Sequence, residues 1–238
     1  MKICAVIPVF DNADTIGEVV RRTRAVMEPD VLVVSDGSGD GSDDAARAAG
    51  AEVVSHERNL GKGRAILTGL EACLERGFTH AVMLDADGQH LPEEIPALLD
   101  AAWDNPDKLI VGERRMDPAL TPASSRHGRA ISNFWATVDG WRRFRDVQSG
   151  FRVYPIEATL ALGCREPRFS FEMEVLVRAS WAGLGFVHVP VSVCYPNRRS
   201  THFDMRGDNL RFSWLSFCLF WGMLARLPLL LWRVLANI

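Results

Sequence analysis

Short apolar runs alternate with longer stretches of helical periodicity along the first 112 residues. The apolar runs, rich in β-branched residues and too short for helices, are residues 2–10, 31–36, 51–56, 80–85 and 108–112. The helical stretches between them are about 13–27, 41–50, 61–77 and 91–103. Strand and helix in alternation require parallel pairing with right-handed crossovers. The sequence therefore predicts a doubly wound, mostly parallel, Rossmann-like α/β sheet.

The pattern is less regular after Gly112. A polar, proline-containing stretch at 113–129 is long enough to predict a functional flap. Beyond it the sequence predicts a helix at 130–141, a strand at 146–155, a helix at 171–183 and a strand at 186–195. At the first helix, Thr15 and Glu18 have the spacing of a capping box.

Composition narrows the class of protein. The chain has 238 residues, 47% of them hydrophobic, and a formal net charge of -3, which favours a globular protein and gives no sign of a nucleic-acid partner. Its five cysteines are scattered and form no C-x-x-C pair, so we expect reduced thiols and a cytoplasmic protein without structural zinc. The N-terminus lacks the long apolar region of a secretory signal.

Acidic residues follow the ends of several predicted strands. Asp11, Asp36 and Asp85 each end a strand, and Asp87 follows Asp85 after one residue. Parallel strands place these groups on one rim, where ligands bind. A turn explains a single aspartate, but the repulsion within the pair at 85 and 87 needs a positive charge. A Mg²⁺ or Mn²⁺ ion bound by Asp85, Asp87 and the Gln89 side-chain oxygen would supply it and would hold a nucleoside diphosphate.

Other metal and phosphate enzymes are alternatives. The sequence D-A-D-G at 85–88 is similar to the nucleophile motif of haloacid-dehalogenase-type phosphatases, but it follows the fourth predicted strand instead of the first. A P-loop and a G-x-G-x-x-G motif are both missing. A phosphatase and a non-catalytic sugar-nucleotide-binding protein remain the alternatives to a transferase.

Five motifs occur in a fixed order along the chain. They are IPVFDN at 7–12, VVSDGSGDGS at 33–42, NLGKGRA at 59–65, LDADGQH at 84–90 and DVQSGFRVY at 146–154. Together they resemble glycosyltransferase family 2, with the greatest likeness to its polyprenyl-phosphate branch, which includes dolichyl-phosphate mannose synthases. The resemblance covers about residues 3–196. It implies a GT-A fold, a UDP- or GDP-sugar donor, a Mg²⁺ or Mn²⁺ cofactor and an inverting transfer to a lipid-linked acceptor.

The resemblance also implies roles for individual residues. The nucleotide-binding set is Pro8, Phe10, Asn12, Asp36, Gly61, Gly63, Asp85 and Ala86, and the metal-binding set is Asp85, Asp87 and Gln89. The chain departs from the family pattern at three positions. Ser35 stands in place of the first acid of D-D-G-S, Asn12 in place of a frequent glutamate, and Gly88 in place of the leucine common in the polyprenyl branch.

Catalytic groups depend on the acceptor. A hydroxyl acceptor needs a general base, for which Asp146 and Glu174 are the candidates, whereas a lipid phosphate is already an anion and needs none. An ion pair with one of the arginines within 142–145 explains Asp146 nearly as well. Glu172 and Glu174 are two residues apart on a predicted helix, so at most one of them points into the site.

Arginine forks suit an acceptor phosphate. The residues expected near it are Arg114, Arg126, Arg129, Ser149, Arg198 and His202. The last two lie in YPNRRSTHF at 195–203, which resembles the glycosyltransferases of bacterial aryl-polyene gene clusters.

The C-terminal end differs in composition from the rest. We expect a catalytic domain over residues 1–205 and a basic, aromatic helical tail over 206–238. The uncharged run 212–225 is too short to span a bilayer, and Arg226 follows it. An interfacial helix, with tryptophans at the lipid headgroups, would place the enzyme on the inner face of the cell membrane. The alternative is a helix that packs on the sheet or on a second copy in a homodimer.

Overall fold

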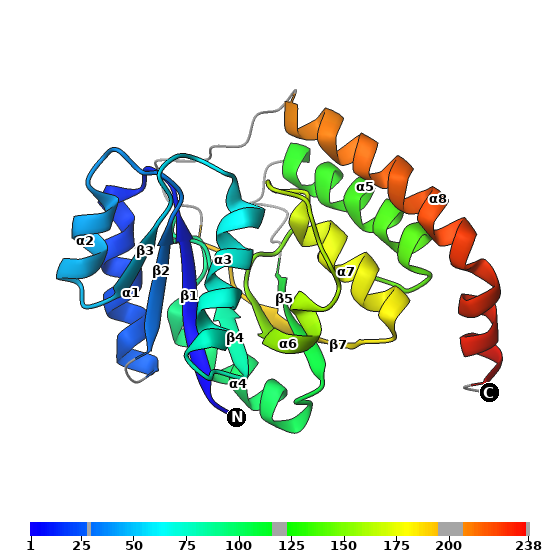
Figure 1. The fold of residues 1–238 in the computed structure, drawn as a ribbon, viewed down its shortest axis with the longest axis horizontal. Coiled ribbons are helices and arrows are strands. Elements are labelled where there is room, and N and C mark those ends of the chain that lie inside the picture. Colours follow the sequence, from blue (N-terminus) through cyan, green and yellow to red (C-terminus); the bar gives the residue numbers. More distant parts are fainter. Residues whose placement is uncertain (28–29, 116–122, 195–206, 237–238) are drawn as a thin grey trace.

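The computed structural model describes residues 1–27, 30–115, 123–194 and 207–236 (Figure 1). Its strands are β1 (Ile3–Val9), β2 (Val31–Ser35), β3 (Glu52–Ser55), β4 (His80–Met83), β5 (Lys108–Arg114), β6 (Arg152–Pro155) and β7 (Gly185–Val191). Its helices are α1 (Ala13–Val26), α2 (Ser42–Ala48), α3 (Lys62–Glu75), the 3-10 turn η1 (Pro92–Glu94), α4 (Ile95–Asp104), α5 (Ala123–Gly140), α6 (Ile156–Leu160), α7 (Phe171–Ala182) and α8 (Gly207–Ala236).

The strands form one sheet in the order β3-β2-β1-β4-β6-β5-β7 (Figure 1). The four strands β1, β2, β3 and β4 pair in parallel with one another, and β5 pairs in parallel with β7. This confirms the doubly wound, mostly parallel α/β sheet. β6 is the exception, because it pairs antiparallel with both β4 and β5. Its first residue, Arg152, lies opposite Met83, the last residue of β4, and opposite Val111 in the middle of β5. The segment before β6 therefore reaches the rim at which the parallel strands end.

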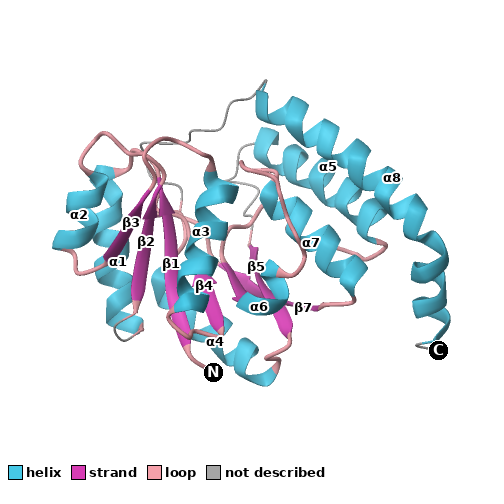
Figure 2. Cartoon of the chain, viewed as in Figure 1, coloured by secondary structure: helices cyan, strands magenta, loops and turns pink. Residues whose placement is uncertain are grey.

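Helices cover both faces of the sheet (Figure 2). Alternate residues of β1 enter different cores: Cys4 and Val6 pack with residues of α3 and α7, whereas Ala5, Ile7 and Val9 pack with residues of α1 and α4. Successive side chains of a strand point to opposite faces, so a strand covered on both sides needs apolar residues at every position. This explains the unbroken apolar runs of the sequence.

Helix α1 begins without the predicted capping box. Its N-cap is Asn12, whose side chain makes no capping bond. The carboxylate of Asp40, in the loop between β2 and α2, instead accepts a hydrogen bond from the Ala13 amide over 2.8 Å. The capping box of Thr15 and Glu18 is therefore wrong, because a loop distant in sequence supplies the acceptor.

The stretch predicted to be a flap, 113–129, is only partly irregular. β5 continues to Arg114, and α5 already begins at Ala123, seven residues before the predicted helix. Residues 123–129 are therefore helical, which corrects that part of the flap prediction. The remainder includes residues 116–122, which lie outside the described residues.

The last helix, α8, packs against α5 and α7 (Figure 1). Leu215, Leu219 and Met223 are buried on its inner side. Near its middle, the Arg226 guanidinium lies 4.7 Å from the ring centre of Trp181 on α7. No described helix combines the length and the apolar character needed to cross a membrane. The proposed boundary between residues 205 and 206 stays a prediction, since 195–206 lie outside the described residues.

A row of large apolar side chains remains exposed on the other side of α8. Its members on α8 are Leu210, Trp214, Phe217, Trp221 and Leu224, and the neighbouring α5 adds the exposed Ile131, Phe134 and Trp135. Spacings of three and four residues place the members of each helix on one side. We call these eight side chains the aromatic face.

Candidate active site

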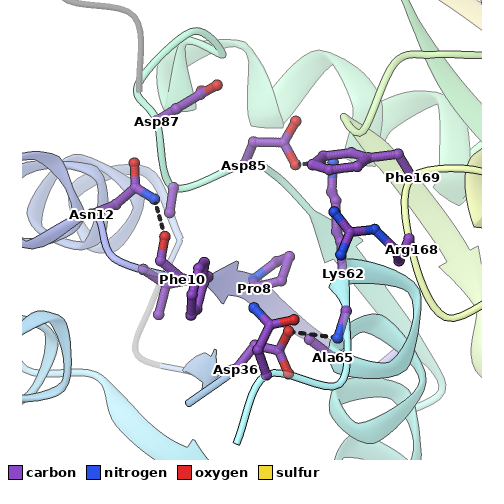
Figure 3. A pocket seen from close by; sticks show the side chains of 14 residues that line it. Pro8, Phe10, Asn12, Asp36, Lys62, Ala65, Asp85, Asp87, Arg168 and Phe169 are labelled. Atoms are coloured by element: carbon purple, nitrogen blue, oxygen red, sulfur yellow. Dashed lines mark hydrogen bonds and ion pairs between the residues drawn. The ribbon is translucent and has the colours of Figure 1, made fainter. Parts of the chain in front are cut away.

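A cavity of about 370 Å³ opens beyond the carboxyl ends of β1, β2 and β4, beside the first turn of α3 (Figure 3). Seven of the residues predicted to bind the nucleotide line it: Pro8, Phe10, Asn12, Asp36, Gly61, Asp85 and Ala86. Asp87 lines it as well. Six residues that the sequence analysis did not select also form its wall: Val9, Asn59, Lys62, Ala65, Arg168 and Phe169. The strand-end aspartates at 36 and 85 therefore meet at one cavity, as the parallel sheet predicts.

Asp36 joins the end of β2 to the loop before α3. One of its carboxylate oxygens accepts a hydrogen bond from the Leu60 amide over 2.8 Å, and the other accepts one from the Gly61 amide over 2.7 Å. The His56 ring nitrogen Nδ1 lies 2.7 Å from the first oxygen. These contacts fix the loop that forms one wall of the cavity.

The glycines of NLGKGRA allow α3 to approach a distant loop. Gly61 has φ +98°, and a Cβ there would lie 2.2 Å from the Pro167 carbonyl oxygen. A Cβ on Gly63 would lie 2.2 Å from the Glu166 carbonyl oxygen. Only glycine fits such contacts. The close approach of α3 to the loop at 166–167 brings Arg168, the next residue of that loop, to the cavity wall.

Lys62 lies between two carboxylates at the base of the cavity. Its Nζ is 2.6 Å from Asp85 Oδ1 and 2.7 Å from Glu172 Oε1. Burial alone would lower the Lys62 pKa, but Asp85 and Glu172 together outweigh burial and raise it. For Asp85, burial alone would raise the pKa, but the Lys62 charge lowers it to about 2. The first acid of D-A-D is therefore a carboxylate already paired with a cation (Figure 3).

In the described part of the chain, Asp87 has no cationic partner of this kind. Burial, and then the nearby Asp85 charge, raise its pKa to about 6. Its two oxygens accept hydrogen bonds from the Gln89 amide over 3.0 Å and from Gln89 Nε2 over 2.9 Å. Among the residues that the structure describes, Asp87 forms no ion pair. Rotating the Gln89 side-chain amide by half a turn would place its oxygen beside this carboxylate.

A divalent cation fits this pair of side chains. Mg²⁺ and Mn²⁺ prefer oxygen ligands, and a cation would supply the positive charge that Asp87 lacks. Within the described part of the chain, no three His, Cys, Asp or Glu side chains converge into a complete metal cage. Such ions commonly take only one or two protein carboxylates and complete their shell with substrate phosphate oxygens and water.

His90, the last residue of LDADGQH, has a packing role. Its side chain is buried, and its ring stacks on Phe151 with 5.2 Å between the ring centres. Burial lowers its pKa to about 4, so the ring is neutral near pH 7. The neutral ring can accept the hydrogen bond that the Asp85 amide donates to Nδ1 over 3.3 Å. His90 therefore supports the backbone at Asp85.

Comparison with known proteins identifies the family. Residues 4–165 match the sequence model of Glycosyl transferase family 2. The chain belongs to this family. It is a glycosyltransferase, as the five motifs predicted, and the family assignment replaces the phosphatase alternative.

Two curated relatives extend over most of this glycosyltransferase. An undecaprenyl-phosphate mannosyltransferase from Micrococcus luteus is 29% identical over 204 residues, which is 81% of this chain and 83% of the relative. A polyprenol monophosphomannose synthase from Mycolicibacterium smegmatis is 30% identical over 93% of this chain and 87% of the relative. The names of both relatives support the polyprenyl-phosphate branch.

A solved structure confirms the GT-A fold. Glucosyl-3-phosphoglycerate synthase from Mycobacterium tuberculosis, in complex with Mn²⁺, UDP-glucose and phosphoglyceric acid, superposes with a TM-score of 0.72 at 20% identity. The similarity covers 93% of this chain and 79% of that one. Identity at this level establishes the shared fold alone.

The glycosyltransferase holds Asp146 in a buried ion pair outside the cavity wall. Arg114 contacts Asp146 over 2.8 Å, and Arg129 contacts it over 3.3 Å. The prediction that an arginine within 142–145 pairs with Asp146 is therefore wrong. The arginines that pair with it lie on β5 and α5. Burial alone would raise the Asp146 pKa, but hydrogen bonds and charge from Arg114 lower it.

Glu174 lies outside the cavity wall too. One of its oxygens accepts hydrogen bonds from the Arg165 and Glu166 amides, each over 2.8 Å, and the other accepts one from Arg178 over 2.7 Å. Of the two glutamates on α7, Glu172 is the one directed to Lys62 and the site. The choice of Glu174 as a catalytic candidate therefore has no geometric support.

The remaining predicted residues lie at various distances from the cavity. Arg126 is exposed on the first turns of α5, and Ser149 is fully buried before β6. Gly63 is packed against the loop at 166 and does not line the cavity. Arg198 and His202 lie outside the described residues. Their assignment to the acceptor phosphate stays a prediction.

Lys62 and Glu172 are the main residues that sequence reasoning missed. Lys62 is inside the quoted motif NLGKGRA, and a lysine between two glycines at the start of a helix was a usable signal. Glu172 lies 110 residues later, and nothing in the local sequence connects it with Lys62. Only the packing of α7 beside α3 brings the two together.

Proposed function

We propose that this glycosyltransferase transfers a sugar from a nucleoside diphosphate sugar to a polyprenyl phosphate, with Mg²⁺ or Mn²⁺ as cofactor and with inversion at the anomeric carbon. The names of the Micrococcus and Mycolicibacterium relatives support a polyprenyl-phosphate acceptor. The Mn²⁺ and UDP-glucose bound by the mycobacterial synthase support the donor and the metal. The single observation that carries the proposal is the cavity at the rim, with Asp36 in its wall and the aspartates of D-A-D at its edge.

The donor half is built from β1, β2, β4 and α3. Pro8, Phe10 and Asp36 would surround the base, and Asp85 would face the ribose. Asp87 and Gln89 would hold the cation, with Asp85 nearby. A bound Mg²⁺ or Mn²⁺ would stabilise the charge that develops on the departing diphosphate. Arg168, on the opposite wall, is close enough to the cavity to contact the same anion.

The acceptor half is built from β5, α5 and the segment before β6. Arg114 and Arg129 both contact the carboxylate of Asp146, which brings two guanidinium groups together in this half. Two guanidinium groups in this position suit a phosphate. Arg126, Ser149, Arg198 and His202 are the further candidates for this half.

The reaction then needs no general base. An oxygen of the acceptor phosphate attacks the anomeric carbon, the bond from that carbon to the diphosphate oxygen breaks, and the nucleoside diphosphate leaves with the bonding electrons. A single displacement of this kind inverts the configuration. Asp146 serves by holding the arginines and not by accepting a proton.

The reaction would take place at the inner face of the cell membrane, with the protein attached peripherally. A polyprenyl phosphate resides in the membrane, and the aromatic face carries Trp214 and Trp221, which are suited to lipid headgroups. Arg211 and Arg226 are exposed on the same helix and would attract anionic lipid. Residues 206–238 would thus form the attachment tail that follows a catalytic domain over 1–205.

A transfer assay tests the proposal. The purified full chain is incubated with polyprenyl phosphate, Mn²⁺ and each of a panel of radiolabelled UDP- and GDP-sugars, and the lipid fraction is counted. We expect transfer with one class of donor, loss of transfer on adding EDTA, and loss of transfer in Asp87→Asn. The exposed Asp107→Asn is the control of equal charge change. Absence of transfer, together with absence of Mn²⁺-dependent nucleotide binding, would overturn the proposal.

A further inference from the structure

Glu172 has no role in the reaction described so far, although it belongs to the site. It lies in the first turn of α7, its side chain is 5% exposed, and its Oε1 is 2.7 Å from Lys62 Nζ. Burying a carboxylate is costly unless a cation compensates it. Lys62 already neutralises Asp85, so Glu172 adds a second negative charge to the same ammonium group.

Among the described residues, the charges at the cavity are therefore unbalanced. Its lining residues contribute the carboxylates of Asp36, Asp85 and Asp87 and the cations Lys62 and Arg168. Glu172, behind Lys62, makes the excess of negative charge larger by one. A nucleoside diphosphate carries two or three negative charges of its own and would be repelled by this excess. A divalent cation at Asp87 would remove the repulsion.

We propose that Glu172 is a positioning residue that makes donor binding depend on the divalent cation. By sharing the Lys62 ammonium group with Asp85, it prevents Lys62 from acting as the counter-ion of the diphosphate. The anion must then bring its own metal. This inference rests on the proposed function, because it takes the cavity to be the site of a nucleoside diphosphate.

The effect of neutralising Glu172 has a definite sign. In Glu172→Gln the cavity gains one unit of positive charge, and Asp85 remains the one charged partner of Lys62 among the described residues. One charge about 10 Å from a ligand charge changes affinity by about tenfold at an effective dielectric constant near 20. Free UDP or GDP should therefore bind more tightly in the absence of metal. The metal complex of the nucleotide carries less charge, so its affinity should change less.

The experiment compares dissociation constants with and without Mn²⁺. UDP and GDP are titrated calorimetrically into the full-length wild type, Glu172→Gln, Glu172→Asp and Glu71→Gln, with EDTA or with Mn²⁺. Glu71 is the matched control, because it loses the same charge on the outer side of α3, where its carboxylate pairs with Arg64. Thermal melts establish that each variant is folded. Glu172→Met, similar in length and uncharged, replaces Glu172→Gln if that variant is unfolded.

We expect metal-free nucleotide binding to tighten by about tenfold in the neutral variant and to stay within threefold of wild type in Glu172→Asp and Glu71→Gln. A purely structural role for Glu172 would weaken binding or leave it unchanged, and either result would overturn the inference. Wild type that binds neither nucleotide with Mn²⁺ would overturn the proposed function as well. If wild type binds a nucleotide with Mn²⁺, but Glu172→Gln binds it no more tightly than wild type when Mn²⁺ is absent, only the role of Glu172 is overturned.

Discussion

Arg114 meets the carboxylate of Asp146 side on: its Nε and its Nη2 each donate a hydrogen bond to a different oxygen, both over 2.8 Å. Asp146 is fully buried, the Arg114 amide also donates to it over 3.2 Å, and Arg129 adds a further contact. A carboxylate with a lowered pKa and two arginine partners is a weak proton acceptor. Its position beside the rim is therefore best explained by the arginines that it orients.

Asp146→Asn tests this role. An amide cannot pair with two guanidinium groups, so we expect the free energy of unfolding to fall by about 3 kcal/mol and the KM for polyprenyl phosphate to rise. The KM for the donor should change little, because Asp146 does not line the cavity. Steady-state kinetics with each substrate varied in turn, and urea unfolding, give the measurements. An unchanged acceptor KM with a large loss of kcat would instead identify Asp146 as a general base.

Gly150→Ala tests the placement of Asp85. A Cβ at position 150 would lie 2.7 Å from both oxygens of the Asp85 carboxylate, so the carboxylate must move away from its present position beside Lys62. We expect nucleotide affinity with Mn²⁺ to fall by about tenfold, the loss of about one hydrogen bond to a charged group. Calorimetric titration of UDP and GDP measures it.

Gly17→Ala is the matched control for that substitution. Its new Cβ on α1 would have its nearest neighbour at 3.5 Å, an ordinary contact, and alanine stabilises a helix interior by about 0.5–1 kcal/mol relative to glycine. Nucleotide affinity should be that of wild type. Equal affinities in both glycine variants would contradict the role given to the position of Asp85.

Asp139→Asn should alter the pH dependence of stability. Asp139 is fully buried on α5, its two carboxylate oxygens have no hydrogen-bond partner in the described structure, and burial raises its pKa to about 7. Between its ordinary pKa near 4 and about 7, the folded chain therefore binds a proton that the unfolded chain has lost. The stabilising effect of this group is complete below about pH 4 and is lost as the pH rises through 7.

Urea unfolding at pH 5 and pH 8 measures the effect. We expect the free energy of unfolding of wild type to fall by about 2–4 kcal/mol between pH 5 and pH 8 because of this group. In Asp139→Asn the fall should be much smaller, since an amide does not titrate. Asp107→Asn, at an exposed position, should keep the wild-type slope. A slope in Asp139→Asn equal to that of wild type would show that the group does not titrate as described.

Removing the aromatic face should reduce membrane binding. The triple variant with serine at Trp214, Phe217 and Trp221 loses three exposed rings, so its melting temperature should change little. We expect its partition onto phosphatidylglycerol vesicles to fall by more than about tenfold, given about 2 kcal/mol for each large side chain fully buried. Vesicle co-sedimentation is the measurement, and Trp103→Ser, exposed on α4, is the control.

Two results would contradict that prediction. Equal sedimentation of the triple variant and wild type would show that the aromatic face does not contact lipid. A wild-type dimer that dissociates in the triple variant, seen by analytical ultracentrifugation, would assign the face to a second copy of the chain.

The fold was largely predictable, because local patterns determine it. The apolar run of β1 lies where the structure has a strand covered on both faces, and the aspartates at 36 and 85 meet because parallel strands end on one rim. The direction of β6 was not predictable, since an antiparallel strand buried on both faces has the same composition as a parallel one.

The contacts within the site were less predictable than its location. Lys62 and Glu172 are far apart in sequence, as are Asp146 and Arg114, so each pair depends on tertiary packing. Asp146 was assigned to neighbouring arginines because sequence reasoning ranks near residues first. The buried carboxylate of Asp139 carried no signal at all, because an aspartate on a helix is ordinarily taken to be exposed.

Under the proposed function, the reversed direction of β6 would separate the two substrates. The proposed donor contacts come mainly from segments that follow β1, β2 and β4, whereas Asp146 and Gly150 reach the same rim on a segment that precedes a strand. Changes in length or composition within 141–147 would therefore reshape the lipid side and leave the nucleotide side in register. An enzyme arranged in this way can diverge toward new acceptors while it retains its donor.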